Sequence, residues 1–153
     1  ASSGFAFRRA PGPFQVASGI RTDVTAPAVD EIFKELRGMV EKPVGQDELG
    51  KAKDALANSL PGAFESSANA VGNFSNVFIY DLGLDYYTKY AAQVNAVTTD
   101  QTLAMAKKYL VPGSMVVIAV GDRAKIEPAL KGLNLGEIVV LDVEGKQVVA
   151  GTK

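Results

Sequence analysis

The sequence contains no histidine and no cysteine. Without these residues the chain cannot form a His-based catalytic triad, a Cys nucleophile or the usual His and Cys ligands of zinc. The absence of cysteine also excludes disulfides and leaves the redox compartment unconstrained. No apolar run approaches the ~20 residues that cross a bilayer, so we expect no membrane span. The sequence therefore excludes several familiar routes to catalysis before any motif is considered.

Neither sign of charge dominates, because 16 Lys and Arg are balanced by 17 Asp and Glu. This balance has neither the basic footprint of a nucleic-acid-binding protein nor a polybasic membrane patch, so we expect no nucleic-acid partner. A carboxylate-only site for magnesium or calcium is the alternative route to a metal. The acidic residues fall on expected helix surfaces beside basic ones, however, which favours solvated ion pairs. These residues are Asp30, Glu31, Glu35 and Glu48, beside Lys34, Arg37 and Lys51.

The chain has 153 residues, of which 47% are hydrophobic, and this composition suits one globular domain with a real core. We expect a single α+β domain over residues 1–153, without repeats or an internal boundary. Ala1 falls directly inside what looks like a strand, and these residues contain no pattern that predicts a signal peptide. We therefore expect the chain to be a piece of a longer protein.

The stretch from Ser114 to Asp122 organises the expected fold. Its apolar run, residues 115–120, is rich in β-branched side chains and is bounded by Pro112-Gly113 and Gly121-Asp122. This pattern predicts a strand buried on both faces in the middle of a sheet. A nucleotide site at the following turn is the weaker alternative, because G-x-G-x-x-G and G-K-[ST] are both absent.

The rest of the chain predicts a hairpin, five helices before the central strand, one helix after it and a last strand. The hairpin covers residues 3–9 and 13–21, joined by a Pro-rich connection. The last strand covers residues 138–141. Residues 143–153 carry little pattern beyond Val148-Val149, and we expect them to fray or to pair at an edge. The order β-β-α-α-α-α-α-β-α-β predicts an α+β fold, with a helical block packed on one face of a largely antiparallel sheet.

Particular residues define the expected helices by caps, breakers and apolar spacing. The first helix follows caps in Thr22–Thr25, the second begins near Gly45 with Glu48 in a capping box, and the third ends at Gly83. Asp85, the Thr98-x-x-Gln101 box and Asp122 start the remaining three. The expected inward stripes are Val29, Ile32, Phe33, Leu36 and Val40; Leu49, Ala52, Leu56 and Leu60; Phe64, Ala68, Val71, Phe74, Phe78 and Leu82; Tyr87, Tyr90, Ala91 and Val94; Leu103, Ala106 and Leu110; and Ile126, Ala129 and Leu130.

An ordered series of segments resembles the pitrilysin/insulinase family of zinc metallopeptidases over nearly the whole chain. The segments are Phe64-Glu65-Ser66, Leu82-Gly83-Leu84-Asp85-Tyr86-Tyr87, Val94-Asn95-Ala96-Val97-Thr98-Thr99-Asp100, Ala106-Lys107-Lys108-Tyr109-Leu110, Val117 to Asp122, and Leu133-x-Leu135-Gly136 to Leu141-Asp142. The opening hairpin, with its Arg-Arg-x-x-Gly sequence, fits the same series. No single motif is decisive, and the order of the segments carries the resemblance.

The resemblance implies that two similar α+β halves close around a peptide chamber. In that family the N-terminal half holds zinc through an inverted His-x-x-Glu-His motif and a distant Glu. The C-terminal half usually lacks the metal and contributes an Arg and a Tyr. This chain resembles the later part of a C-terminal half and would begin just after that Tyr. No catalytic residue can therefore be carried over, and the early strands of the half would be missing as well.

The resemblance favours a non-catalytic, substrate-enclosing segment of a zinc peptidase. Zinc is then expected in the missing half or in a partner subunit, and this chain alone is expected to be inactive. The expected substrate-proximal residues are Phe5, Phe7, Phe14, Arg8 and Arg9, although two arginines at a hairpin tip are commonly just solvated. A structural or interaction subunit of the same family and an unrelated α+β domain are the alternatives. We also expect a peptide substrate and self-association, and the resemblance suggests a periplasmic setting.

Overall fold

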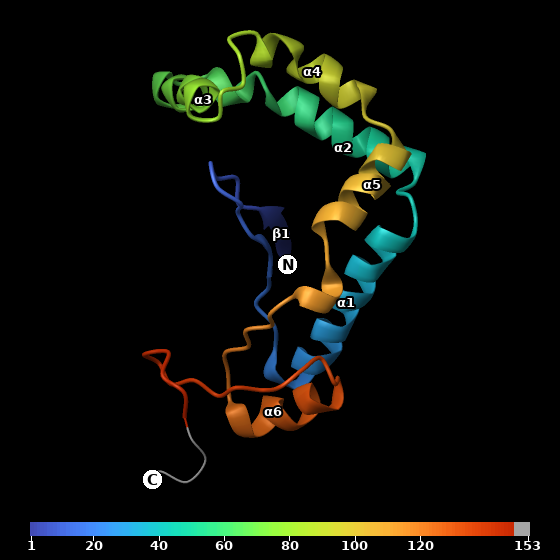
Figure 1. Ribbon diagram of the computed structural model, residues 1–153, viewed down its shortest axis with the longest axis vertical. Coiled ribbons are helices and arrows are strands. Elements are labelled where there is room, and N and C mark those ends of the chain that lie inside the picture. The colour runs from blue at the N-terminus through green and yellow to red at the C-terminus, as the bar shows by residue number, and fades with distance from the viewer. Residues whose placement is uncertain (149–153) are drawn as a thin grey trace. The chain divides into compact units, whose positions relative to one another are not determined.

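The computed structural model describes residues 1–148 and has an α+β fold with six α-helices and one small antiparallel sheet (Figure 1). The strands are β1 (Ser2–Phe5) and β2 (Phe14–Ala17). The α-helices are α1 (Thr25–Glu41), α2 (Gln46–Ser59), α3 (Ser67–Ile79), α4 (Tyr86–Ala96), α5 (Thr99–Tyr109) and α6 (Arg123–Gly132). Three 3-10 turns, η1 (Thr22–Val24), η2 (Gly62–Phe64) and η3 (Pro112–Ser114), lie between them.

The chain divides into two compact units. One unit contains residues 1–18 and 34–115, and the other contains residues 19–33 and the chain from Val116 onward. Helix α1 runs through the division, so it contributes its first half to one unit and its second half to the other. The expectation of a single domain over the whole chain stays a prediction.

All six expected helices form, and their starts follow the local signals in the sequence. The capping box at Thr98 is complete: Gln101 N–H donates to Thr98 Oγ1 at 3.2 Å, and Thr98 N–H donates to Gln101 Oε1 at 2.9 Å. Asp122 caps α6 by accepting the Ala124 N–H at 3.1 Å. The box expected at Glu48 is incomplete, because the N-cap residue of α2 is Gly45, which has no side chain. Asp85 precedes α4 as expected but does not accept a capping hydrogen bond.

The buried residues lie mainly on the predicted helix faces. Helix α1 buries residues spaced by three and four positions, as a helix with one apolar face does. These are Ala26, Val29, Phe33 and Leu36, and the other buried apolar residues are Leu49, Val77, Ala106, Leu110 and Ile126. No large side chain in residues 1–148 is less than 2% exposed. The face of α2 differs from the prediction, since Leu56 is 49% exposed and Ala52 is exposed too.

The expected central strand does not form. Residues 115–120 form neither helix nor strand, and Val116, Ile118 and Val120 are 86%, 85% and 96% exposed. Side-chain propensity alone does not make a strand, because a strand also requires a neighbour that completes its backbone hydrogen bonds. No residue of the described chain forms such bonds with Val116–Val120. In residues 1–148 the sheet therefore holds only the two strands of the hairpin.

The last expected strand, residues 138–141, is also absent as a named strand. Leu141 instead forms an isolated antiparallel bridge with Gln147, and Val148 N–H donates to the Val140 carbonyl at 2.8 Å. Between them Asp142 organises a tight turn, because its Oδ1 accepts the N–H groups of Glu144 and Lys146. Of the expected pair Val148-Val149, the second residue lies outside the described chain.

The aromatic face of α3, which was expected to be buried, is largely exposed to solvent. Val71, Phe74 and Phe78 are 66%, 55% and 74% exposed, whereas Val77 is buried. Two hydrogen bonds explain this rotation: Asn73 Nδ2 donates to the Ala63 carbonyl at 2.7 Å, and Tyr87 Oη donates to the Asn73 carbonyl at 3.0 Å. They hold the Asn73 side of the helix toward its neighbours. Phe78 is therefore largely exposed, whereas Phe74 is partly exposed and still contacts Phe64 and Tyr87.

The end of α3 also differs from the prediction. Asp81, rather than Gly83, takes the left-handed position after the helix, with a φ of 53°. Leu82 N–H donates to the Val77 carbonyl at 3.0 Å, which is the long hydrogen bond of a Schellman ending. Gly83 has a φ of 85° and lies in the connection to α4. None of the helices among residues 1–148 is long and apolar enough to cross a membrane.

Candidate functional site

The hairpin brings two of the five expected site residues together. β1 and β2 pair antiparallel, with Phe5 directly opposite Phe14. Their ring centroids lie 4.9 Å apart at 52°, and Tyr109 of α5 meets Phe5 edge-on at 6.4 Å. Lys108 Nζ lies 5.0 Å from the centroid of the Tyr109 ring. These rings attach the hairpin to the end of α5 by aromatic contacts.

Phe7 lies beyond the paired strands and is held by its backbone rather than by its ring. Its carbonyl accepts a hydrogen bond from Tyr80 Oη at 3.1 Å, while its side chain is 83% exposed. The residue before Phe7 is held as well, because Ala6 N–H donates a hydrogen bond to the Pro13 carbonyl at 2.9 Å across the hairpin connection. A fixed backbone with a solvent-exposed aromatic ring is a suitable anchor for another molecule.

The tip of the hairpin requires glycine at position 12. A Cβ atom on Gly12 would lie 1.7 Å from the Ala6 carbonyl oxygen. Only glycine therefore allows the backbone at position 12 to approach the backbone at Ala6 this closely. Arg8 and Arg9, the remaining expected site residues, are exposed within this connection. No ion pair involves either guanidinium in the described part of the chain. The hairpin therefore presents an aromatic ring and two cations from a constrained backbone.

A second aromatic cluster joins η2, α3 and α4. Phe64, Phe74 and Tyr87 meet one another at centroid distances of 5.0 to 6.4 Å, and Tyr86 lies 5.0 Å from Tyr87. Burial, together with its tyrosine neighbours, raises the pKa of Tyr86 above its ordinary value. Phe64 and Phe74 were expected in the core, whereas the contacts of Tyr86, Tyr80 and Tyr109 were not predicted. In the sequence these three tyrosines are recognisable only as aromatic residues, and aromatic character does not indicate which distant residue each one contacts.

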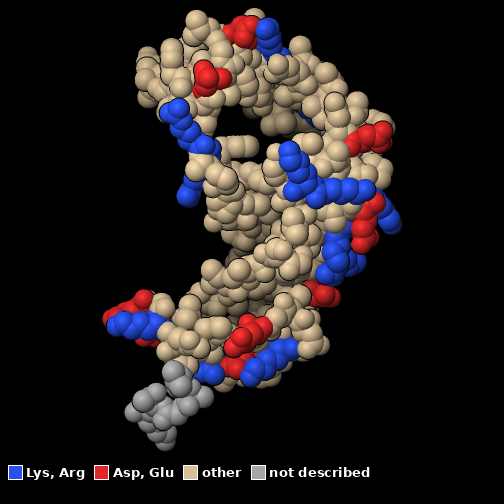
Figure 2. Space-filling view, in the orientation of Figure 1, with Lys and Arg blue, Asp and Glu red and all other residues tan. Residues whose placement is uncertain are grey.

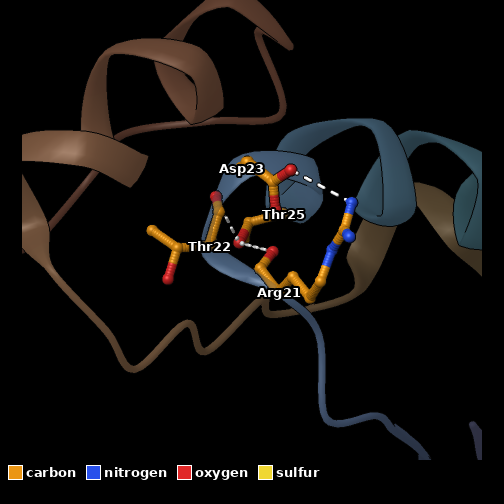
Figure 3. Close-up of polar contacts among 4 residues, drawn as sticks. All are labelled: Arg21, Thr22, Asp23 and Thr25. Carbon is orange, nitrogen blue, oxygen red and sulfur yellow. Dashed lines mark hydrogen bonds and ion pairs between the residues drawn. The ribbon is translucent and has the colours of Figure 1, made fainter.

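A pocket of about 440 Å³ lies in the unit that contains the start of α1 and α6. Its lining residues are Thr22, Asp23, Thr25, Ala26, Pro27, Lys125, Ile126 and Ala129. Beside it, Arg21 Nη2 contacts Asp23 Oδ2 at 3.1 Å, and Thr25 Oγ1 donates to the carbonyls of Arg21 and Thr22 (Figure 3). These polar groups satisfy one another and stabilise the first turn of α1, so we assign them a structural role.

The ionisable residues form local pairs rather than a reactive cluster. Arg123 and Lys131 flank Glu127 on α6, with contacts of 2.5 Å and 2.6 Å, and both lower the pKa of Glu127 to about 2. Lys89 pairs with Asp85 and lowers the pKa of that carboxyl group. Figure 2 shows acidic and basic side chains scattered among broad uncharged areas on the visible face.

The donor set of this chain does not fit a resident zinc ion. The sequence offers neither His nor Cys, and within residues 1–148 no three carboxylates converge. Zinc in proteins takes tetrahedral sets of Cys, His and carboxylate ligands, and a catalytic site needs three of them. We therefore assign no chemical step to a metal held by these residues. In comparisons with known proteins, the chain matches no family model, no curated protein and no solved structure.

Proposed function

We propose that this chain is a non-catalytic, substrate-enclosing segment of a zinc-dependent peptidase of the pitrilysin/insulinase type. In this proposal the zinc belongs to another half or to a partner subunit, and the chain takes the half-domain fold of that family. The ordered series of segments from Phe64 to Asp142 supports the assignment, as does a hairpin followed by a run of helices. The peptide meets the hairpin surface, which we define as Phe5, Phe7, Arg8 and Arg9.

The observation that carries the proposal is the state of Phe7. Its ring is 83% exposed although Tyr80 fixes its carbonyl. Exposing a large aromatic ring has a free-energy cost that binding recovers, and the ordered backbone limits the entropy lost when a partner arrives. Arg8 and Arg9 add positive charge beside the ring. An extended peptide that alternates bulky apolar and acidic residues matches this combination.

Equilibrium binding of a fluorescein-labelled peptide of alternating Leu and Glu residues tests the proposal by anisotropy. We expect saturable binding to the full chain and a loss of affinity on the order of tenfold for Phe7→Ala, since one buried aromatic anchor contributes at least that much. Phe78→Ala is the matched control, because Phe78 is also an exposed phenylalanine, at 74%, on a different surface. Equal affinity of both variants and the wild type would contradict a role for the hairpin surface.

A structural or interaction subunit is the second candidate function. The exposed face of α3, formed by Val71, Phe74 and Phe78, favours it, because contiguous apolar surface commonly marks a protein interface. The same anisotropy assay separates the two functions. A chain that serves only as a structural subunit binds no peptide, and Phe7→Ala then has no effect to measure.

A further inference from the structure

We propose that Val116–Val120 is a strand-pairing site for a second copy of this chain. The segment contains no charged residue, and neither do its neighbours from Val111 to Gly121. Three of its side chains, Val116, Ile118 and Val120, are 86%, 85% and 96% exposed. This inference goes beyond the proposed peptide function and does not involve the hairpin surface.

The backbone of the segment is free to pair. Its residues belong to no helix or strand, and none of them forms a backbone hydrogen bond with any residue of the described chain. Met115, immediately before it, has an extended backbone with φ −84° and ψ 147°. Extended β-branched residues with unpaired N–H and C=O groups recruit another strand, because pairing satisfies those groups and covers the side chains together.

The sequence of the exposed face identifies a second copy as the occupant. In an extended strand, side chains alternate between two faces, so pairing would place Val116, Ile118 and Val120 on one face, and Val-x-Ile-x-Val reads the same in both directions. An antiparallel pair with its two-fold axis at Ile118 therefore places Ile118 against Ile118 and Val116 against Val120. All three cross-strand pairs are β-branched and apolar, which stabilises neighbouring strands. This arrangement is the isologous contact that two-fold dimers require.

The size of the contact sets the expected affinity. Stable interfaces bury ~800 Å² on each partner, and a pairing of five residues covers less than this area. We therefore expect a dimer with a dissociation constant on the order of micromolar or weaker. The absence of charge in the segment removes electrostatic repulsion between the two copies, which an identical charged strand would suffer.

Single cysteines test the register, since the chain contains no cysteine of its own. Directly opposite residues in an antiparallel pair have Cα atoms about 4.5 to 5.5 Å apart, which is within disulfide range. We expect Ile118→Cys to form a disulfide dimer under mild oxidation. Val116→Cys alone and Val120→Cys alone should remain monomeric, because each would lie about 14 Å from its own copy. A mixture of the Val116→Cys and Val120→Cys chains should form the mixed dimer.

Leu84→Cys is the control for random collision, because Leu84 is also 86% exposed. Non-reducing gels should show Ile118→Cys dimers on the order of tenfold above this control, as expected for sulfurs held within bonding distance. The inference is overturned if Ile118→Cys dimerises no more than Leu84→Cys. It is overturned equally if Val116→Cys, Val120→Cys and Ile118→Cys all dimerise alike, because that pattern shows contact without register.

Sedimentation equilibrium of the unmodified chain provides a second readout. The weight-average mass should rise with concentration toward that of a dimer, and Ile118→Asp should abolish the rise by placing two carboxylates opposite each other. Val143→Asp is the matched control, because Val143 is fully exposed outside the segment. A wild-type chain that stays monomeric throughout, or an Ile118→Asp chain that dimerises like the wild type, would refute the inference.

Discussion

Lys53 of α2 donates a hydrogen bond from Nζ to the backbone carbonyl of Asn95 at 2.9 Å, across 42 residues of sequence. Asn95 lies one residue before the end of α4, where helix carbonyls lack intrahelical partners and attract positive charge. The two helices pack side by side, as Figure 1 shows, and this bond connects the middle of α2 to the C-terminal end of α4. Lys53 is thus only partly exposed, and its ammonium group lies against the last turn of α4.

We predict that Lys53→Met lowers the free energy of unfolding by about 0.5 to 1 kcal/mol. Methionine keeps most of the aliphatic stem but removes the donor, so the Asn95 carbonyl loses its partner. Thermal denaturation followed by circular dichroism measures the change. Lys51→Met is the control, because Lys51 is exposed on the same helix. Equal melting temperatures for the two variants would show that the bond to Asn95 does not contribute.

Gly12→Ala should disrupt the hairpin connection. The new methyl group would meet the Ala6 carbonyl oxygen at 1.7 Å, so the backbone must move, at a cost of about 1 to 3 kcal/mol. We expect faster amide exchange at Ala6, whose N–H donates to Pro13, and weaker binding of the Leu-Glu peptide.

Gly4→Ala is the matched substitution for that experiment, since a Cβ atom on Gly4 has nothing within 4 Å. Gly4 lies inside β1, where alanine is accommodated without strain. If Gly4→Ala and Gly12→Ala have the same effect on amide exchange, the close approach at the tip is not important.

The pH dependence of stability should include a contribution from Glu127. Its pKa is about 2 in the folded chain, below the ordinary value of 4.5, because Arg123 and Lys131 favour the charged carboxylate. A depressed pKa stabilises the folded state above pH ~4.5, and this stabilisation is lost as the pH falls toward 2. Since both cations are largely exposed, salt should weaken the effect.

Glu127→Gln should therefore flatten the dependence of the melting temperature on pH between about 4.5 and 2. Above that window the variant should be less stable than the wild type, and near pH 2 the two should converge. Parallel curves for the two proteins throughout the window would contradict a shifted pKa at Glu127.

Ile118→Asp distinguishes the structure from the sequence-based expectation. A strand buried on both faces predicts that this substitution unfolds the chain, because it places an unpaired charge in the core. The 85% exposure of Ile118 predicts instead that the melting temperature of the dilute monomer changes by no more than about 2–4 °C. A thermal melt of Ile118→Asp, at a concentration well below that of self-association, measures the difference. A variant that is already unfolded at room temperature would show that Val116–Val120 is a buried strand.

The parts of the fold that sequence predicts correctly depend on residues close together in the chain. The Thr98–Gln101 box and the Asp122 cap lie within four positions of their partners, and the buried spacing of Val29, Phe33 and Leu36 follows from helix geometry. Val116–Val120 has the composition of a strand, but its pairing depends on a partner that composition does not specify.

In the candidate site, too, the sequence does not indicate contacts between residues far apart in the chain. The sequence predicted that Phe5 and Phe14 lie on the two strands of one hairpin. It did not predict that they pair directly, because the observed strands end at Phe5 and begin again at Phe14, which sets a different register from that of the expected strands 3–9 and 13–21. The contacts of Phe5 with Tyr109 and of Phe7 with Tyr80 bridge 104 and 73 residues, and no local pattern indicates them. The orientation of α3 depends likewise on the hydrogen bond from Asn73 to Ala63, and it leaves Phe74 55% exposed beside Phe64 and Tyr87.

Photo-crosslinking of a bound peptide tests the central claim most directly. The Leu-Glu peptide, carrying a benzophenone group, is incubated with the full chain, irradiated, and located by mass spectrometry. The account predicts that the intact, uncleaved peptide attaches within Phe5–Arg9, and that Phe7→Ala reduces the attachment while Phe78→Ala does not. Attachment at Phe78 or scattered over the chain would contradict the hairpin surface, and recovery of a cleaved peptide would contradict the non-catalytic role.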